Sequence, residues 1–525
     1  MTIKPSLIAV LALSLASTVL PAQVWRADQG DGTYRNPVLF ADYPDPDIIR
    51  VGEDFYFITT TFANAPGMTI LHSKDLVNWQ IAGHLMDRLE GNPRYELSDG
   101  GDYRRGFFAA SMRHHKGTFY VAVSPIGLNT RIYRASSPTG PWTYTELDRH
   151  AFDPALFFED DGQAYLITSI GTDGTISLLT MNEDVSKITA SKVVHYNKGA
   201  EGSKVIKREG WYYLFNSLPS KLALTVSRAR SLQGPWETQP QIDDTSGGHQ
   251  GALVDLANGD WSGFVMVDAG SIGRMTNISP VYWQDDWPIW GTPEAPGRVP
   301  DRAAKPINGH PFAEPRASDD FSASTLGLQW QWNHNPDDRR WSLRERPGFL
   351  RLHATQADRL WTARNTLTQK GQGPASRAVI KVDMRGLRTG DICGFGTFGK
   401  ISAQLSIVGS SQGRRALTMM VTDSTEAGPH TETRVASLPV SGQTLWLRTD
   451  MDFIHDKGHV AYSRDGRNWT EVGNSFPLKY DWRTGTFQGQ QFAMSCYNTR
   501  PAGGYIDIDS FTLLPLPVAK VEAQP

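Results

Sequence analysis

Three acidic residues stand at the entrances of strand-like runs that lie far apart in the chain. Asp45 is in YPDPDIIRV, Asp153 in AFDPALFFED and Glu201 in AEGSKVIKRE. Two carboxyl groups that flank a glycosidic bond are the minimal machinery for its hydrolysis, since one assists the leaving oxygen as an acid and the other activates water. A third carboxylate raises the pKa of the acid by like-charge repulsion. These residue types therefore suit glycoside hydrolysis if the fold brings them together.

Local conformation offers a simpler explanation for Asp45. Proline restricts the residue before it, which predicts an extended geometry for Asp45, and Asp and Pro are both common in turns. On this stretch alone, an ordinary turn at a strand entrance is the stronger interpretation. A catalytic interpretation needs evidence that distant residues converge.

An internal repeat supplies that evidence. A Gly/Asp turn followed by an aromatic residue within a strand recurs five times, at intervals of 64, 45, 48 and 48 residues; the markers are Tyr56, Tyr120, Tyr165, Tyr213 and Trp261. Four of the markers are followed by a turn that ends in tryptophan, such as SKDLVNW or SSPTGPW. Periods of about 45–50 residues with several short strands are typical of propeller blades. We expect a five-bladed β-propeller over residues 34–300, with an insertion around 87–105 in the longer first unit.

Equivalent positions in the repeat bring the acids into one ring. Asp45 stands 11 residues before its marker, and the residues 12 before the other markers are Phe108, Asp153, Glu201 and His249. The first strand of each blade lines the central channel, so these side chains are expected at one mouth of that channel. Clustered acids that perturb one another mark functional sites. The repeat therefore favours a catalytic constellation over a turn.

The composition and the first residues of the chain bear on the number of domains, on nucleic-acid binding and on export. With 525 residues the chain is too long for one ordinary core, and its net charge of −3 predicts no nucleic-acid partner. Residues 1–22 carry Lys4 and then an apolar stretch, which predicts a secretory signal cleaved near Ala22, and hence a periplasmic or extracellular protein without a membrane span. An uncleaved anchor is the alternative. Cys393 and Cys496 form either a disulfide or two buried thiols.

The acidic blocks resemble the signature blocks of glycoside hydrolase family 43. They read NPVLFADYPDPDIIRVGEDFYF, AFDPALFFEDDGQAYLI and AEGSKVIKREGWYYLFNS, in that order. The segments LGLQWQWNHNPDDRRWSLRERPGFLRL and YIDIDSFTLL are similar to the concanavalin-like β-sandwich of the β-xylosidase/α-L-arabinofuranosidase branch. The resemblance implies an all-β chain with a signal peptide (1–22), a propeller (34–300), a linker (301–318) and a β-sandwich (319–516).

The resemblance also implies roles for the three acids. Asp45 corresponds to the general base, Glu201 to the general acid, and Asp153 to the residue that tunes and orients the acid. The family inverts, so the carboxyl groups of Asp45 and Glu201 are expected about 6.5–9.5 Å apart, with a water between base and sugar.

Four further pocket residues follow from the same resemblance. Phe62 and Phe108 correspond to aromatic walls, Arg274 to a residue that binds a substrate hydroxyl, and His249 to a channel histidine that helps to hold a cation or water cluster. A surface arginine and a core histidine are the alternatives for the last two. The chain departs from the family at Phe108-Ala109-Ala110, where Trp-Ala-Pro is frequent, and at Lys204, where histidine is frequent.

These expectations amount to an exo-acting glycosidase that releases a terminal α-L-arabinofuranose or β-D-xylose from hemicellulose oligosaccharides. No cofactor is expected for the chemistry, although the resemblance implies that Asp320 and Asp509 share a structural calcium ion; exposed acids are the alternative. An endo-arabinanase or galactosidase of the same fold, and a non-catalytic sugar-binding propeller, are the other functions weighed. The preference between the two pentoses and the oligomeric state stay open.

Overall fold

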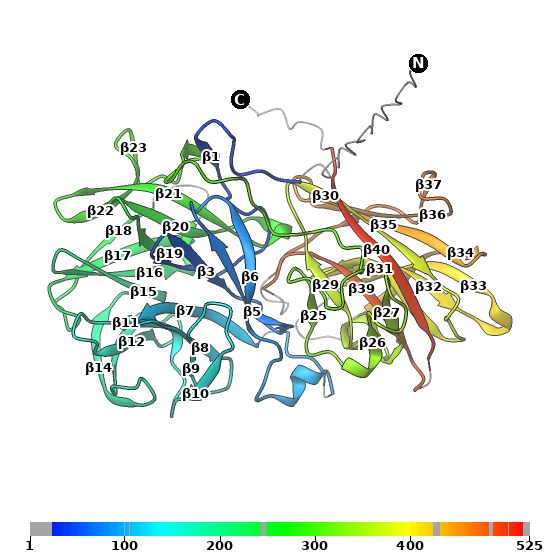
Figure 1. Cartoon of the computed structure of the whole chain (residues 1–525), viewed down its shortest axis with the longest axis horizontal. Helices are drawn as coiled ribbons and strands as arrows, with labels where there is room; N and C mark the ends of the chain where they lie inside the picture. Colours follow the sequence, from blue (N-terminus) through cyan, green and yellow to red (C-terminus); the bar gives the residue numbers. More distant parts are fainter. Residues whose placement is uncertain are drawn as a thin grey trace, which may run out of the picture.

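The computed structural model describes residues 24–98, 100–103, 105–242, 248–423, 431–481, 487–501 and 503–517. Figure 1 shows a propeller, coloured blue to green, beside a sandwich of two sheets, coloured yellow-green to red. The predicted all-β class, a five-bladed propeller followed by a concanavalin-like sandwich, is confirmed. The predicted signal peptide lies outside the described residues. Within the described ranges, no helix has the length and apolar character needed to cross a membrane.

Each blade is an antiparallel sheet whose strands follow one another in chain order. Blade 1 contains β2 (Asp47–Val51), β3 (Asp54–Thr59), β5 (Gly67–Ser73) and β6 (Trp79–Met86), and blade 2 contains β7 (Phe107–His115), β8 (Thr118–Pro125), β9 (Arg131–Ala135) and β10 (Thr143–Glu146). Blade 3 contains β11 (Phe152–Phe158), β12 (Ala164–Ser169), β13 (Thr175–Met181) and β14 (Ile188–Tyr196). Blade 4 contains β15 (Glu201–Arg208), β16 (Trp211–Leu218), β17 (Ala223–Ala229) and β18 (Glu237–Pro240). Blade 5 contains β19 (Gly248–Asp255), β20 (Trp261–Asp268), β21 (Arg274–Gln284), β22 (Trp287–Thr292) and β23 (Ala295–Pro296).

The repeat in the sequence corresponds to these sheets strand for strand, since every marker aromatic lies on the second strand of its blade. The first strand of each blade contacts the first strand of the next, and β19 returns to β2, so the first strands surround one axis. Apolar side chains fill the space between blades; Phe55, Phe57 and Trp79 of blade 1 belong to the same buried cluster as Tyr213 of blade 4 and Trp290 of blade 5.

The chain before blade 1 closes the ring against blade 5. The Val38 N–H donates to the Thr276 carbonyl at 3.1 Å, and the Tyr43 N–H to the Arg274 carbonyl at 3.0 Å. The strand β1 (Thr33–Arg35) pairs with β24 (Arg302–Ala304), so the expected linker 301–318 contains a strand. Residues 302–304 of this segment are thus tied to the chain that precedes blade 1.

The sandwich has one sheet of nine strands and one of eight in the described part of the chain. The first contains β4 (Asn64–Ala65), β25 (Gln331–Asn333), β28 (Thr355–Gln356), β29 (Leu367–Lys370), β31 (Asp391–Phe398), β32 (Ile401–Gly409), β33 (Arg415–Asp423), β34 (Thr431–Val440) and β39 (Gln491–Asn498). The second contains β26 (Trp341–Ser342), β27 (Leu350–His353), β30 (Ala375–Asp383), β35 (Thr444–Asp452), β36 (Lys457–Ser463), β37 (Trp469–Glu471), β38 (Phe476–Pro477) and β40 (Tyr505–Pro515). A disulfide joins Cys393 on β31 to Cys496 on β39. The short 3₁₀ turns are η1 (Pro93–Glu96), η2 (Pro219–Lys221), η3 (Gly270–Ile272), η4 (Asp338–Arg340), η5 (Leu360–Thr362) and η6 (Ser411–Gly413).

The two domains share both a sheet and a core. The propeller residues of β4 pair with β25 of the sandwich. In blade 5, Ile272 ends η3 and Met275 lies on β21. Both are buried in the same cluster as the sandwich tryptophans Trp330 and Trp332. The sandwich is therefore packed directly against the propeller. Its segment from Phe487 onward also contacts the propeller, because the Gly489 N–H donates to the Asp42 carboxylate at 3.0 Å.

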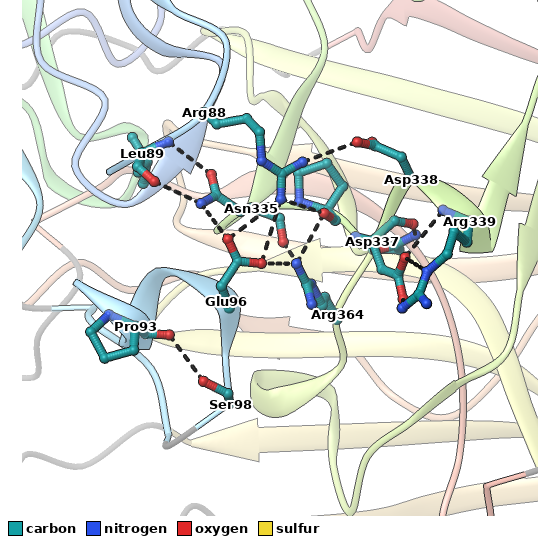
Figure 2. A network of polar contacts seen from close by, with 12 residues as sticks. Arg88, Leu89, Pro93, Glu96, Ser98, Asn335, Asp337, Asp338, Arg339 and Arg364 are labelled. Atoms are coloured by element: carbon teal, nitrogen blue, oxygen red, sulfur yellow. Dashed lines mark hydrogen bonds and ion pairs between the residues drawn. The ribbon is translucent and has the colours of Figure 1, made fainter. Parts of the chain in front are cut away.

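The insertion in the first unit bonds to the sandwich (Figure 2). The side chain of Asn335 accepts the Leu89 N–H and donates to the Leu89 carbonyl, each at 2.8 Å, and also donates to Glu96 at 2.9 Å. Arg364 of the sandwich forms an ion pair with the same Glu96, and Arg88 donates to Asp338 at 3.1 Å. The polar residues of this insertion thus connect two domains.

Replacing Asn335 by alanine is expected to destabilise the protein by about 2–3 kcal/mol, because the buried N–H and carbonyl of Leu89 lose their partner. Chemical denaturation of both proteins measures the change. Asn258→Ala is the matched control, since Asn258 bonds only within an exposed turn; a similar loss in both variants would contradict the expectation.

Candidate active site

A cavity of about 340 Å³ lies where the first strands of the blades begin, and it collects the three predicted acids. Its walls come from every blade and from the sandwich; they include Asp45, Phe108, His150, Asp153, Glu201, Gln250, Arg274 and Phe487. The size is within the range of small-molecule pockets. The convergence expected from the repeat is therefore present in the fold.

A repeated backbone feature sets the direction of the wall residues. One residue at the start of each first strand has a left-handed conformation, namely Asp45 (φ 54°), Ala109 (φ 33°), Asp153 (φ 43°), Gly202 (φ 59°) and Gln250 (φ 47°). In blades 2 to 5 the pairing with the second strand shifts at this residue, as in a β-bulge. The extended geometry predicted for Asp45 is wrong, because its φ before Pro46 is positive.

Asp45 forms an ion pair with Arg274. One guanidinium nitrogen lies 3.0 Å from a carboxylate oxygen, and the two residues are 3 % and 8 % exposed. Burial acts to lower the pKa of Arg274, but Asp45, Tyr480 and Asp42 outweigh it, so the net shift is upward. The pair places a lasting positive charge beside Asp45, which suits a base rather than an acid.

Glu201 and Asp153 have raised pKa values. Burial, followed by the negative charge of Asp45, raises the pKa of Glu201 to about 7, although Arg274 acts in the opposite direction. Burial and then the charges of Glu201 and Asp45 raise the pKa of Asp153 well above its ordinary value, against Lys204 and the Gly202 N–H. Two acids in one pocket oppose the loss of the second proton, so this pair holds a proton close to neutral pH.

Three phenylalanines form an aromatic cluster beside these acids. Phe108 lies edge-on to Phe62 and to Phe487, with ring centroids 5.0 and 5.8 Å apart. Phe62 is only 1 % exposed and supports the wall from behind, stacked on Phe487 and beneath the Arg274 guanidinium. Phe108 and Phe487 line the cavity itself. Sequence reasoning missed Phe487 because it comes from the sandwich, more than a domain away in the chain.

His249 lies behind the pocket wall. Its Nδ1 is 3.0 Å from the Ser217 hydroxyl and its Nε2 is 3.0 Å from the Asp268 carboxylate. Both ring nitrogens are therefore engaged by protein groups, which favours a satisfied core histidine over a metal ligand. The next residue, Gln250, lines the cavity instead.

Asp320 and Asp509, the residues expected to bind calcium, are engaged by other protein groups. Asp509 forms an ion pair with Lys381 at 2.9 Å, and Asp320 accepts the hydroxyl and N–H of Ser322. In the described ranges, no group of three or more histidine, cysteine or carboxylate side chains has an arrangement that holds a metal. Calcium takes six to eight oxygen ligands, a number that these two carboxylates do not supply.

This propeller pocket holds an ion-paired carboxylate and two acids with raised pKa values, which are the groups that hydrolysis of a glycosidic bond requires. The family model described as Glycosyl hydrolases family 43 matches residues 34–288, and the one described as Beta xylosidase C-terminal Concanavalin A-like domain matches residues 318–513. The chain belongs to glycosyl hydrolase family 43, and it is an enzyme that hydrolyses O-glycosyl bonds.

Its relatives include two types of pentosidase. The chain is 30 % identical to a β-xylosidase of Formosa agariphila, over 92 % of this chain and 91 % of the relative. It is 33 % identical to a non-reducing end α-L-arabinofuranosidase of Bacteroides ovatus, over 62 % of this chain and 65 % of that protein. A solved bifunctional GH43-CE protein of Bacteroides eggerthii has the same fold, with a TM-score of 0.84 and 33 % identity over 92 % of this chain and 64 % of that one.

Proposed function

We propose that this protein is an inverting exo-glycosidase that releases a terminal β-D-xylose or α-L-arabinofuranose from hemicellulose oligosaccharides. The observation that carries the proposal is the division of labour in one pocket: Asp45 is ion-paired with Arg274, whereas Glu201 has a pKa raised to about 7. An inverting glycosidase needs one ionised and one protonated carboxyl group at neutral pH.

The proposed reaction uses each acid once. Asp45 removes a proton from a water molecule, whose oxygen forms the new bond to the anomeric carbon. The bond to the leaving oxygen breaks at the same time, and Glu201 donates its proton to that oxygen, so that no charge is left on the departing sugar. Asp153 is proposed as a positioning residue, since it lines the same pocket as Glu201 and the charge of Glu201 raises its pKa.

The walls of the pocket favour a single neutral sugar. Side chains from all the blades and Phe487 of the sandwich surround the cavity, which suits a chain end better than the interior of a polymer. Three carboxyl groups face one guanidinium, an arrangement that disfavours anionic uronic acids. The names of the Formosa and Bacteroides ovatus relatives support xylose and arabinofuranose as the sugars released.

Product analysis with the full chain tests this proposal. Nitrophenyl β-D-xylopyranoside, nitrophenyl α-L-arabinofuranoside, xylobiose and longer oligosaccharides are incubated with the protein, and proton NMR follows the first anomer formed. We expect monosaccharide release from one end, with α-xylose or β-arabinofuranose appearing first. Oligosaccharide products from internal cleavage, the retained anomer, or no hydrolysis of either pentoside would overturn the proposal.

The pH dependence of kcat/KM is expected to report the Asp153–Glu201 pair. Activity falls as pH rises through the Glu201 pKa of about 7, because the acid loses the proton that it must donate. The charge of Glu201 raises the pKa of Asp153, whereas burial and the charge of Asp45 raise that of Glu201, so Asp153→Asn should leave the alkaline limb near pH 7. Profiles of both proteins on one nitrophenyl pentoside test this, and an alkaline limb that moves in the variant would contradict it.

We also propose that the protein is exported. The apolar stretch of residues 1–22 supports this, as does the Cys393–Cys496 disulfide, because disulfides persist mainly in oxidising compartments. Fractionation of cells that express the full chain, with mass spectrometry of the mature N-terminus, tests the proposal; an intact Met1 in the cytoplasmic fraction would overturn it.

A further inference from the structure

The wall residue contributed by blade 5 occupies the same structural position as two of the acids. Gln250, Asp45 and Asp153 are each the left-handed residue at the start of the first strand of a blade, and all three line the cavity. Blades 2 and 4 have Ala109 and Gly202 there, whose side chains carry no polar group. The left-handed position therefore presents polar side chains to the pocket from blades 1, 3 and 5.

Gln250 carries two energetic costs at this position. Gln250 has a φ of 47°, and a residue other than glycine is strained by roughly 1 kcal/mol or more in this conformation. Its Nε2 atom is buried without a hydrogen-bond partner, and the residue is only 3 % exposed. A buried donor without a partner is costly unless a ligand supplies one. Strain and an unused donor at a pocket wall together indicate a binding role.

The neighbouring strand leaves room for this amide. A methyl group on Gly202 would come within 3.0 Å of the Gln250 Cδ atom, so the glycine next to Glu201 permits the close approach. The amide thus lies beside the residue that follows the proposed acid. A neutral N–H donor at this place matches a sugar hydroxyl, which offers lone pairs and carries no charge.

We propose that Gln250 binds the substrate, with its Nε2 donating a hydrogen bond to one hydroxyl group of the terminal sugar in the pocket. The assignment rests on the proposed function and adds a contact to it. The residue acts on the sugar that is bound and takes no part in proton transfer. Its loss weakens recognition of one hydroxyl and leaves the roles of the three acids unchanged.

The first test replaces Gln250 by glycine, which removes the amide and also relieves the backbone strain. We expect Q250G to fold with at least the thermal stability of the parent and to lose about 3- to 30-fold in kcat/KM on the preferred nitrophenyl pentoside. Lys116→Gly is the matched control, because Lys116 also has a positive φ of 48° but lies in an exposed turn. K116G should gain stability in the same way without kinetic change. An unchanged kcat/KM in Q250G would overturn the proposal.

The second test identifies the hydroxyl and separates binding from a structural role. Parent and Q250G are compared on the 2-, 3- and 4-deoxy analogues of the preferred xyloside, or the 2-, 3- and 5-deoxy analogues of the arabinofuranoside. With one analogue the difference between the two proteins should vanish, because the partner of the amide is already missing. An equal loss on every analogue would assign Gln250 a structural role only and overturn the proposal. Failure of the parent to hydrolyse any pentoside would instead overturn the proposed function.

Discussion

Replacing Glu201 by glutamine is expected to lower kcat on xylo- or arabino-oligosaccharides by about 10²- to 10⁴-fold. The pocket would keep its shape, but the side chain that holds a proton at neutral pH would no longer donate one. The loss should be smaller for a dinitrophenyl pentoside, because its leaving oxygen departs as a stable anion and needs little help from an acid. The alkaline limb near pH 7 should also disappear from the pH profile.

A half-buried glutamate outside the pocket gives the matched control for this experiment. Burial also raises the pKa of Glu432, which accepts the Leu360 N–H in the sandwich. Glu432→Gln should leave kcat and the pH profile as in the parent. If Glu201→Gln loses the same factor on good and poor leaving groups, Glu201 is not the general acid.

Replacing Asp45 by asparagine is expected to remove nearly all hydrolysis, again by about 10²- to 10⁴-fold, with a different substrate dependence. Activation of water is needed whatever group leaves, so the loss should be similar for oligosaccharides and dinitrophenyl pentosides. Sodium azide, a nucleophile that needs no base, should restore turnover of the dinitrophenyl substrate and give a glycosyl azide of inverted configuration.

The ion pair with Arg274 makes a folding control necessary for Asp45→Asn. Both residues are buried, so loss of one charge removes a compensating partner from the other. Circular dichroism and thermal unfolding show whether the variant is folded, and Asp260→Asn, in an exposed turn of blade 5, is the matched control. A folded Asp45→Asn protein with full activity would exclude Asp45 as the base.

The features predicted correctly from the sequence are those that repeat along the chain. The spacing of five aromatic markers predicts the second strand of every blade, because each blade must bury the same pattern of side chains against its neighbours. The same spacing places Asp45, Asp153 and Glu201 on one ring, and the cavity contains all three.

Predictions that depend on one residue of register were less accurate. Counting back from the markers selects His249 in blade 5, whereas the bulge turns Gln250 into the pocket and leaves His249 bonded to Ser217 and Asp268. A shift of one residue along a strand moves a side chain to the opposite face, and sequence spacing alone does not show where a bulge inserts the extra residue.

Periodic burial specifies the blades, and the blades share an axis, so the class of fold, the ring of first strands and the three acids follow from the order of residues along the chain. The groups that close the pocket and balance its charges come instead from contacts between distant parts of the fold. Phe487 arrives from the sandwich, Arg274 reaches Asp45 from another blade, and the insertion bonds to Asn335 of the second domain. These contacts join residues more than 200 positions apart, and no local preference or repeat specifies such pairs.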